Sequence, residues 1–369
     1  MNRPPFRAEH VGSLLRPTRL KNARAQYSRG ELAADALRAV EDECIREVLA
    51  LQEEIGLEAV TDGEFRRSFF HVDFLARLEG VSTDRQSQRV EYRGERSRFA
   101  YDVPVPVVTG RLRRRSSLPL EEFAFLAGAT KRTAKVCIPA PSMLHFLGGD
   151  RAIAGTAYPD VHEFFDDLQR IYREELQALY QAGCRYVQID DPYIAFLCDP
   201  AHRAQVKARG EDAEALPALY ADLIRGAIRE RPSDMAVCVH LCRGNFSRGG
   251  AARGGYEAIA EAVFGRTGAD GFFLEFDDPR SGGFEPLRHV PRDTKVVLGL
   301  VSSKLPDLES KDFLKRRIDE ASRFLPMQNL CLSPQCGFSS TQYGTELTAE
   351  EQAAKLRRVV EAAGYFFGR

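Results

Sequence analysis

Three residues with soft or borderline ligand atoms, His240, Cys242 and Cys336, are the part of this sequence best suited to chemistry. His240 and Cys242 are two residues apart and follow an apolar run over 235–239 that favours a strand. Because side chains alternate along a strand, the imidazole and the thiol then point to the same side. Cys336 follows a second apolar run, 330–332, and can meet the other two if the strands end side by side.

A fourth candidate ligand, Glu275, follows the apolar run 271–274, one predicted strand after His240. A carboxylate buried there without a partner would be costly. Imidazole nitrogen, thiolate sulfur and carboxylate oxygen are all ligands that zinc takes in tetrahedral sites. We therefore predict a zinc site made by His240, Cys242, Glu275 and Cys336. A packed histidine beside an inert thiol is the structural alternative for the H-x-C motif taken alone.

This ligand set suits one kind of reaction. Two thiolates and a carboxylate neutralise Zn²⁺, which leaves a weak Lewis acid well suited to holding an incoming thiol. A free thiol has a pKa of about 8.5, and coordination deprotonates it. We predict attack of the bound thiolate on an alkyl carbon, with Glu275 as the ligand that gives way when the thiol enters.

Other polar side chains follow other predicted strands: Ser13, Asp62, Glu64, Asp190 and Asp191. Glu64 and Asp190 are interpreted as the groups that bind an ammonium on the substrate. For Asp62 and Asp191, capping of a helix is an equally favoured interpretation. A glycosidase with paired carboxylates is a further alternative, but it leaves the histidine and the two thiols without a role.

Short strand-like runs alternate with amphipathic helical segments along the chain, and these elements must position the candidate residues. The strand-like runs are 58–61, 134–139, 186–189, 236–241, 271–276, 295–300 and 330–332, and residues 9–15 can supply an eighth. The helical segments are 34–55, 161–181, 213–229, 256–264, 311–324 and 349–367. About eight strand–helix units predict an α/β fold, a TIM (β/α)8 barrel spanning 1–369 as a single domain. An open doubly wound sheet is the alternative, and the absence of a glycine-rich dinucleotide fingerprint counts against it.

Residues 81–130 interrupt this alternation. The segment is polar, contains the alternating run 103–108 and has four arginines within 110–115. We predict an inserted β-hairpin or excursion over the barrel mouth. The arginines are interpreted as a solvated face, and binding of an anionic substrate tail is the less favoured alternative.

The composition is that of an ordinary globular chain, with 369 residues, 44% hydrophobic residues and a net charge of −1. The sequence shows neither an apolar signal segment nor a stretch of transmembrane length. We therefore expect a cytoplasmic protein that binds neither nucleic acid nor membrane. The eight cysteines argue for buried or site thiols rather than a disulfide scaffold.

Taken together, these motifs resemble the cobalamin-independent methionine synthases, specifically their catalytic C-terminal half. The matching pieces, in family order, are His10-Val11-Gly12-Ser13, Asp62-Gly63-Glu64, Gln188-Ile189-Asp190-Asp191-Pro192, His240-Leu241-Cys242, Glu275 and Pro334-Gln335-Cys336-Gly337. The resemblance implies a TIM barrel that binds one zinc ion through His240, Cys242, Glu275 and Cys336. It also implies that Ser13, Glu64 and Asp190 meet the amino acid part of homocysteine. In that family the homocysteine sulfur is methylated from 5-methyltetrahydrofolate without B12.

Departures from the family pattern concern the methyl donor. The long enzymes carry a second barrel that contributes to folate binding, and this chain is too short for both. Lys304 stands about where those enzymes have a histidine that donates a proton to the folate, Asp191 replaces the usual Glu, and there is no Trp. The donor is therefore open: folate, a corrinoid, a partner protein, or an epoxide as in epoxyalkane:coenzyme M transferase.

Further expectations follow from the same residues. Arg243 and Arg248 either bind an anionic substrate group or belong to a solvated loop. A homo-oligomer and a partner protein that donates the methyl group are both compatible with the resemblance. A non-catalytic barrel with a structural zinc and a metal-free decarboxylase-like barrel are the other function classes considered.

Overall fold

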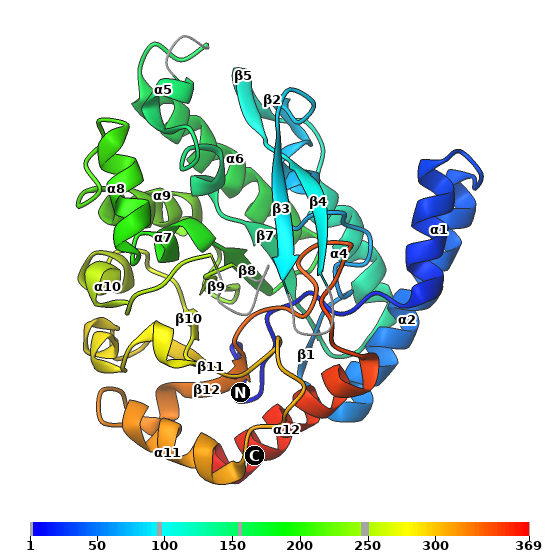
Figure 1. The fold of residues 1–369 in the computed structure, drawn as a ribbon, viewed down its shortest axis with the longest axis vertical. Coiled ribbons are helices and arrows are strands. Elements are labelled where there is room, and N and C mark those ends of the chain that lie inside the picture. Colours follow the sequence, from blue (N-terminus) through cyan, green and yellow to red (C-terminus); the bar gives the residue numbers. More distant parts are fainter. Residues whose placement is uncertain (1–2, 94–97, 154–156, 245–250, 369) are drawn as a thin grey trace.

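The computed structural model describes residues 3–93, 98–153, 157–244 and 251–368, and a parallel sheet lies at its centre (Figure 1). Six strands are hydrogen-bonded in the order β12-β11-β10-β9-β8-β7. Their bounds are β7 (Val136–Pro139), β8 (Tyr186–Asp190), β9 (Ala236–Leu241), β10 (Gly271–Glu275), β11 (Lys295–Val301) and β12 (Leu330–Pro334). Nearly all of their residues are buried, as expected for a parallel sheet that is covered on both faces.

Both edges of this sheet continue into shorter pairings. β6 (Thr133–Ala134), which runs directly into β7, pairs in parallel with β1 (Ala59–Val60). At the other edge, residues 9–15 were expected to supply a strand end, but they form no strand, and the residue before them, Ala8, makes an isolated bridge to Leu332 of β12. The same segment then reaches the loop after β1, where the Leu14 N–H donates to the Gly63 carbonyl at 3.1 Å.

Helices surround the strands in Figure 1. They are α1 (Thr18–Ser28), α2 (Ala34–Ile55), α3 (Val72–Leu75), α4 (Leu118–Ala129), α5 (Gly149–Ile153), α6 (Val161–Gln181), α7 (Pro192–Phe196), α8 (Pro200–Ala208), α9 (Leu216–Ile228), α10 (Glu257–Phe264), α11 (Lys311–Ala321) and α12 (Ala349–Phe367). The bounds of α2, α6 and α12 are those predicted from the sequence. Capping side chains fix two of these starts: Asp160 accepts from the second residue of α6, and Thr348 with Glu351 forms a capping box on α12.

The inserted β-hairpin or excursion expected near 81–130 consists of two antiparallel strand pairs followed by a helix. β2 (Leu78–Ser82) pairs with β5 (Val107–Arg114), and β3 (Ser87–Arg93) pairs with β4 (Arg98–Pro104), both antiparallel, before α4 begins. The run 103–108 is not one strand, because Pro104 and Pro106 lack the N–H that a ladder requires. Helix α4 was not predicted, because its residues are mostly apolar and show no helical period.

The arginines of β5 attach the excursion to α6. Arg111 lies 3.2 Å from Asp167 and also pairs with Glu163. Arg114 lies 2.7 Å from the buried Glu175. These two arginines are therefore ion-pair partners within the fold. In the described residues, the helices are all too short or too polar to cross a membrane. The fold is a mixed α/β architecture.

Candidate active site

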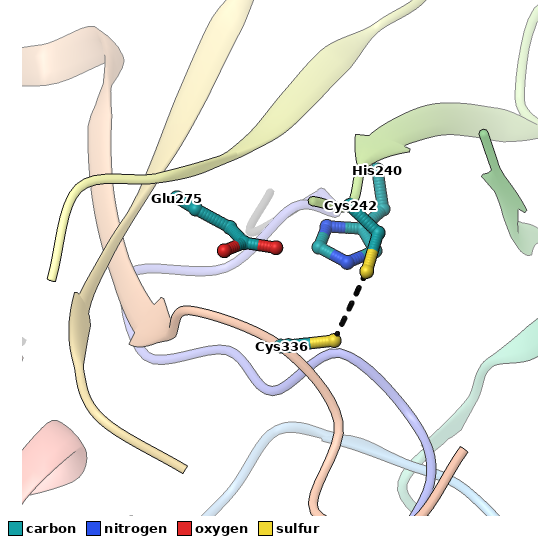
Figure 2. A group of neighbouring side chains, drawn as sticks. All are labelled: His240, Cys242, Glu275 and Cys336. Atoms are coloured by element: carbon teal, nitrogen blue, oxygen red, sulfur yellow. Dashed lines mark hydrogen bonds between the residues drawn. The ribbon is translucent and has the colours of Figure 1, made fainter. Parts of the chain in front are cut away.

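Four side chains from three strand ends converge at one point (Figure 2). His240 lies near the end of β9, Cys242 directly after it, Glu275 ends β10, and Cys336 follows β12. One ligand atom from each lies within 4.8 Å of those of the other three. The Sγ atoms of Cys242 and Cys336 are 3.4 Å apart. The structure thus brings together the four residues predicted from the sequence to bind metal.

The four residues fit a tetrahedral metal ion. Zinc–sulfur bonds of about 2.3 Å place two thiolate ligands about 3.8 Å apart in a tetrahedron, and the two sulfurs, 3.4 Å apart, are close to that separation. His240 Nε2 is buried and has no hydrogen-bond partner among the described residues, while Nδ1 lies 3.3 Å from the Phe273 carbonyl. A buried nitrogen without a partner is costly, and a metal ion would use it.

Acidic groups are concentrated at this point. A hydrogen bond from Cys336 lowers the pKa of Cys242, an effect that burial opposes and that His240 reinforces. Cys336 keeps its proton, because this hydrogen bond and burial raise its pKa. Burial, and then the charge of Cys242, raises the pKa of Glu275 to about 7. The protonation states of Cys242, Glu275 and Cys336 therefore depend on one another, and a divalent cation would stabilise all three in their anionic forms.

A second buried group lies nearby and contains two carboxylates. Glu64, Cys137 and Asp190 also place one ligand atom each within 4.8 Å of one another. Burial, and less strongly the charge of Glu64, raises the pKa of Asp190 to about 7, although His240 opposes this shift. Arg67 Nη1 lies 4.0 Å from Glu64 Oε2. Two neighbouring buried carboxylates are suited to an incoming cation such as an ammonium group.

Glu64 is held in an unusual backbone conformation. Its φ of 59° is the one positive φ among the described non-glycine residues, and it follows Gly63 at 70°. The turn is held by Asp62 Oδ1, which accepts from the Glu64 N–H at 2.8 Å, and by Thr61 Oγ1, which donates to the Gly12 carbonyl at 2.6 Å. The sequence Thr61-Asp62-Gly63-Glu64 therefore places the carboxylate of Glu64 at the cost of local strain.

Ser13 and Asp191 have clear neighbours. Ser13 is buried beside the loop after Cys336, and its Oγ accepts from the Ser339 N–H at 3.4 Å. Asp191 caps α7 by accepting from the Ile194 N–H at 2.9 Å, which confirms the capping interpretation.

Lys304 and Arg243 are both buried, in different surroundings. Lys304 Nζ has no hydrogen-bond partner among the described residues and lines a cavity of about 420 Å³ together with Asp277, Ser302 and Phe313. The Arg243 guanidinium is fully buried, donates to the Gly254 carbonyl and lies 4.2 Å above the Tyr256 ring. Arg248 lies outside the described residues.

Sequence reasoning missed four residues that shape the site. Cys137 lay in an apolar run and was interpreted as an ordinary buried thiol. Arg280 donates to Glu275 Oε2 at 3.2 Å, Arg16 binds two of the surrounding loops, and Tyr256 contacts the ends of β9 and β10. Nothing in the spacing of these residues marks them, because their partners lie in other elements or loops.

Comparison with known proteins identifies the family and agrees with the fold. Residues 6–365 match the family described as cobalamin-independent synthase, catalytic domain. The uncharacterized protein YxjH of Bacillus subtilis strain 168 is 45% identical over 97% of this chain and 94% of its own. The 5-methyltetrahydropteroyltriglutamate–homocysteine methyltransferase of Thermotoga petrophila is 24% identical, and the match covers 98% of this chain but 44% of that enzyme.

Solved structures show the same architecture. The putative vitamin-B12 independent methionine synthase of Listeria monocytogenes has a TM-score of 0.79 and 34% identity, with all of both chains covered. The B12-independent methionine synthase of Shewanella sp. W3-18-1, solved with selenomethionine, has a TM-score of 0.72 at 21% identity and 97% coverage of each chain, which shows the fold alone.

The fold and the family match define an α/β enzyme of the transferase class. The chain belongs to the cobalamin-independent methionine synthase family, whose members are methyltransferases. The resemblance drawn from the sequence motifs is thereby confirmed.

Proposed function

We propose that this protein is a zinc-dependent thiol S-alkyltransferase that methylates homocysteine or a closely related thiol. The observation that carries the proposal is the convergence of His240, Cys242, Glu275 and Cys336. Two sulfur donors favour zinc over the oxygen-seeking ions Mg²⁺ and Ca²⁺. Bound there, zinc would hold the substrate thiol as a thiolate, ready to attack a methyl carbon.

Residues beside the metal ligands are proposed to bind the amino acid part of the thiol. Asp190 and His240 are direct partners in the β8–β9 register. The pair of carboxylates of Glu64 and Asp190 therefore borders the metal ligands. A small amino acid thiol requires this adjacency, because its ammonium and its sulfur are only a few bonds apart. Ser13, next to the Cys336 loop, is proposed to complete this pocket.

Lys304 is proposed to face the alkyl donor and to assist departure of the group that loses the methyl. Its buried ammonium lines a cavity that is also lined by Asp277, two residues after Glu275. Arg243 was predicted to bind substrate, and this assignment stays a proposal.

The fold proposal is a TIM (β/α)8 barrel formed by residues 1–369 as one domain. Support comes from the N-terminal segment, which contacts β12 through Ala8 and the loop after β1 through Leu14. A cluster of buried side chains also draws on this segment, β1 and β8 to β12. A cytoplasmic location is proposed because all eight cysteines are free. A homo-oligomer and a partner that donates the methyl group remain proposals.

An electrophile other than a folate is the second candidate. The chain spans 44% of the length of the Thermotoga enzyme, so that enzyme's substrates do not transfer to it directly. An epoxide opened by the bound thiolate, as in epoxyalkane:coenzyme M transferase, is the alternative.

Assays of the zinc-loaded protein distinguish these functions. Homocysteine is tested against coenzyme M, with 5-methyltetrahydrofolate, methylcobalamin and an epoxide as alkyl donors. Methionine formation that requires zinc supports the proposal, and product from coenzyme M and epoxide supports the alternative. Full activity after complete removal of zinc would contradict both.

A further inference from the structure

The hydroxyl of Tyr256 joins the two strands that carry three of the four metal-ligand candidates. Tyr256 is fully buried directly before α10. Its Oη accepts from the Glu275 N–H at 2.9 Å and donates to the Leu241 carbonyl at 3.3 Å. Leu241 lies between His240 and Cys242, and its pairing with Leu274 is the last rung of the β9–β10 ladder. The hydroxyl therefore bridges the strands where their pairing ends and the ligands begin.

Arg243 fixes the ring that carries this hydroxyl. Its guanidinium lies 4.2 Å above the ring centroid and donates to the Gly254 carbonyl. The main-chain N–H of Arg243 donates to Glu275 Oε1 at 2.7 Å. Glu275 is thus held twice, at its backbone by Tyr256 and at its carboxylate by Arg243, while Arg280 donates to the other carboxylate oxygen.

We infer that Tyr256 is a positioning residue for the metal centre. It sets the distance from Glu275 to His240 and Cys242. The inference rests on the proposed function, because it takes these residues as metal ligands. A buried hydroxyl whose donor and acceptor are both satisfied in a low-dielectric interior is rigid. Partners of this kind, which orient ligands without touching the ion, typically contribute 10- to 100-fold to metal affinity. Arg243 supports the ring through its guanidinium, a contact that does not involve a substrate.

Tyr256→Phe tests the inference, because it removes the hydroxyl and keeps the ring under Arg243. We expect the zinc dissociation constant, measured by competition with a chromogenic chelator, to rise about tenfold. We also expect the visible absorption of the Co²⁺-loaded variant to differ from that of the wild type, since the ligand geometry relaxes. An unchanged dissociation constant together with an unchanged Co²⁺ spectrum would overturn the inference.

Tyr220→Phe is the matched control. Tyr220 is also fully buried, and its hydroxyl lies 2.8 Å from His145 Nδ1, outside the metal site. This variant should lose similar stability, followed by thermal unfolding, and keep the wild-type zinc affinity. A tenfold loss of affinity in this control as well would show a general stability effect and overturn the inference.

A second variant covers the case in which Tyr256→Phe does not fold. Arg243→Lys keeps the charge and the main-chain N–H but loses the planar group over the ring, so it should weaken zinc binding in the same direction. Unchanged affinity in Arg243→Lys would then overturn the inference. A wild-type protein that takes up no zinc would instead overturn the proposed function, so the two failures are distinguishable.

Discussion

At the scale of single residues, the candidate metal site consists of groups that are costly to bury alone. His240 has a buried nitrogen without a partner, Cys242 is drawn toward its anionic form, and Glu275 is fully buried with a raised pKa. Each of these costs disappears when the groups share one divalent cation. The site is therefore better explained as a metal centre than as a packed histidine beside inert thiols.

Replacement of a single site thiol should remove the metal. Cys242→Ser and Cys336→Ser are expected to lose zinc and to lose thiol alkylation almost completely, because a serine hydroxyl is a poor zinc ligand. Zinc content by elemental analysis and product formation check this. Cys184→Ser is the control, since that buried thiol lies 3.5 Å from the Tyr186 carbonyl, away from the site, and should keep its zinc. Normal zinc content in both site variants would contradict the assignment.

Asp190 should make the protein less stable as the pH rises. Burial raises its pKa to about 7, whereas an unfolded Asp titrates near 4. Between these values the unfolded chain is ionised while the folded chain takes up a proton, so stability falls as the pH rises through this window. Asp190→Asn removes the titration. Its stability relative to wild type should therefore grow as the pH rises from 4, by roughly 3–4 kcal/mol, and level off above pH 7.

Urea unfolding at several pH values measures this difference. The same variant should bind homocysteine more weakly, because a neutral amide replaces the carboxylate offered to the ammonium group. Asp35→Asn, an exposed position on α2, is the control and should change stability by less than about 0.5 kcal/mol. A stability difference between Asp190→Asn and wild type that is the same at all pH values would contradict the account.

At the scale of elements, the site depends on loops after the strands that are fastened from inside the protein. Arg16 is buried, and its guanidinium donates to the carbonyls of Glu64 and Arg67 in one loop and to those of Ser339 and Thr341 in another. One side chain thus ties the turn that carries Glu64 to the loop that follows Cys336.

Arg16→Met should loosen both loops together. It leaves several buried carbonyls without a donor, so we expect a loss of about 3 kcal/mol in the free energy of unfolding and a higher KM for the thiol. Urea denaturation and steady-state kinetics check this. Arg19→Met removes an exposed arginine that pairs with Glu47 and should cost less than about 1 kcal/mol. Equal stability of the two variants would contradict this role of Arg16.

The elements predictable from the sequence were those with clear periodicity. Helices 34–55, 161–181 and 349–367 were predicted with the bounds that they have, because their apolar residues recur at helical spacing. Strand 236–241 was likewise predicted in full, together with the metal-ligand candidates at its end. The bounds of the strands in the excursion were not predictable, because prolines interrupt the alternation of side chains there. Helix α4 was not predictable either, because its uniform hydrophobicity hides the helical period.

At the scale of the whole molecule, a buried charge network joins the N-terminal segment to the opposite strands. Glu9 lies 3.3 Å from Lys135 Nζ and accepts from the Tyr186 hydroxyl at 2.9 Å, with both charged side chains fully buried. Lys135 also approaches Gln188 at 3.3 Å, and Gln188 donates to Asp190 at 2.7 Å. Long-range contacts of this kind leave no mark in a local pattern, so the sequence did not reveal them.

A double-mutant cycle on Glu9 and Lys135 tests this closure. Lys135→Met leaves Glu9 buried without its cation and should cost about 3–5 kcal/mol. Adding Glu9→Gln should recover part of that loss, since the uncompensated charge is gone. Urea denaturation of the four proteins gives the coupling energy. Additive effects of the two substitutions would contradict a shared network.

The central claim is that the metal site activates a substrate thiol, and X-ray absorption at the zinc edge tests it most directly. The spectrum of the purified, zinc-loaded protein is recorded before and after addition of homocysteine. The account predicts one zinc per chain, bound by one nitrogen, two sulfurs and one oxygen, that gains a sulfur and loses the oxygen when homocysteine is added. A protein that takes up no zinc, or a zinc shell that is the same with and without the thiol, would contradict it.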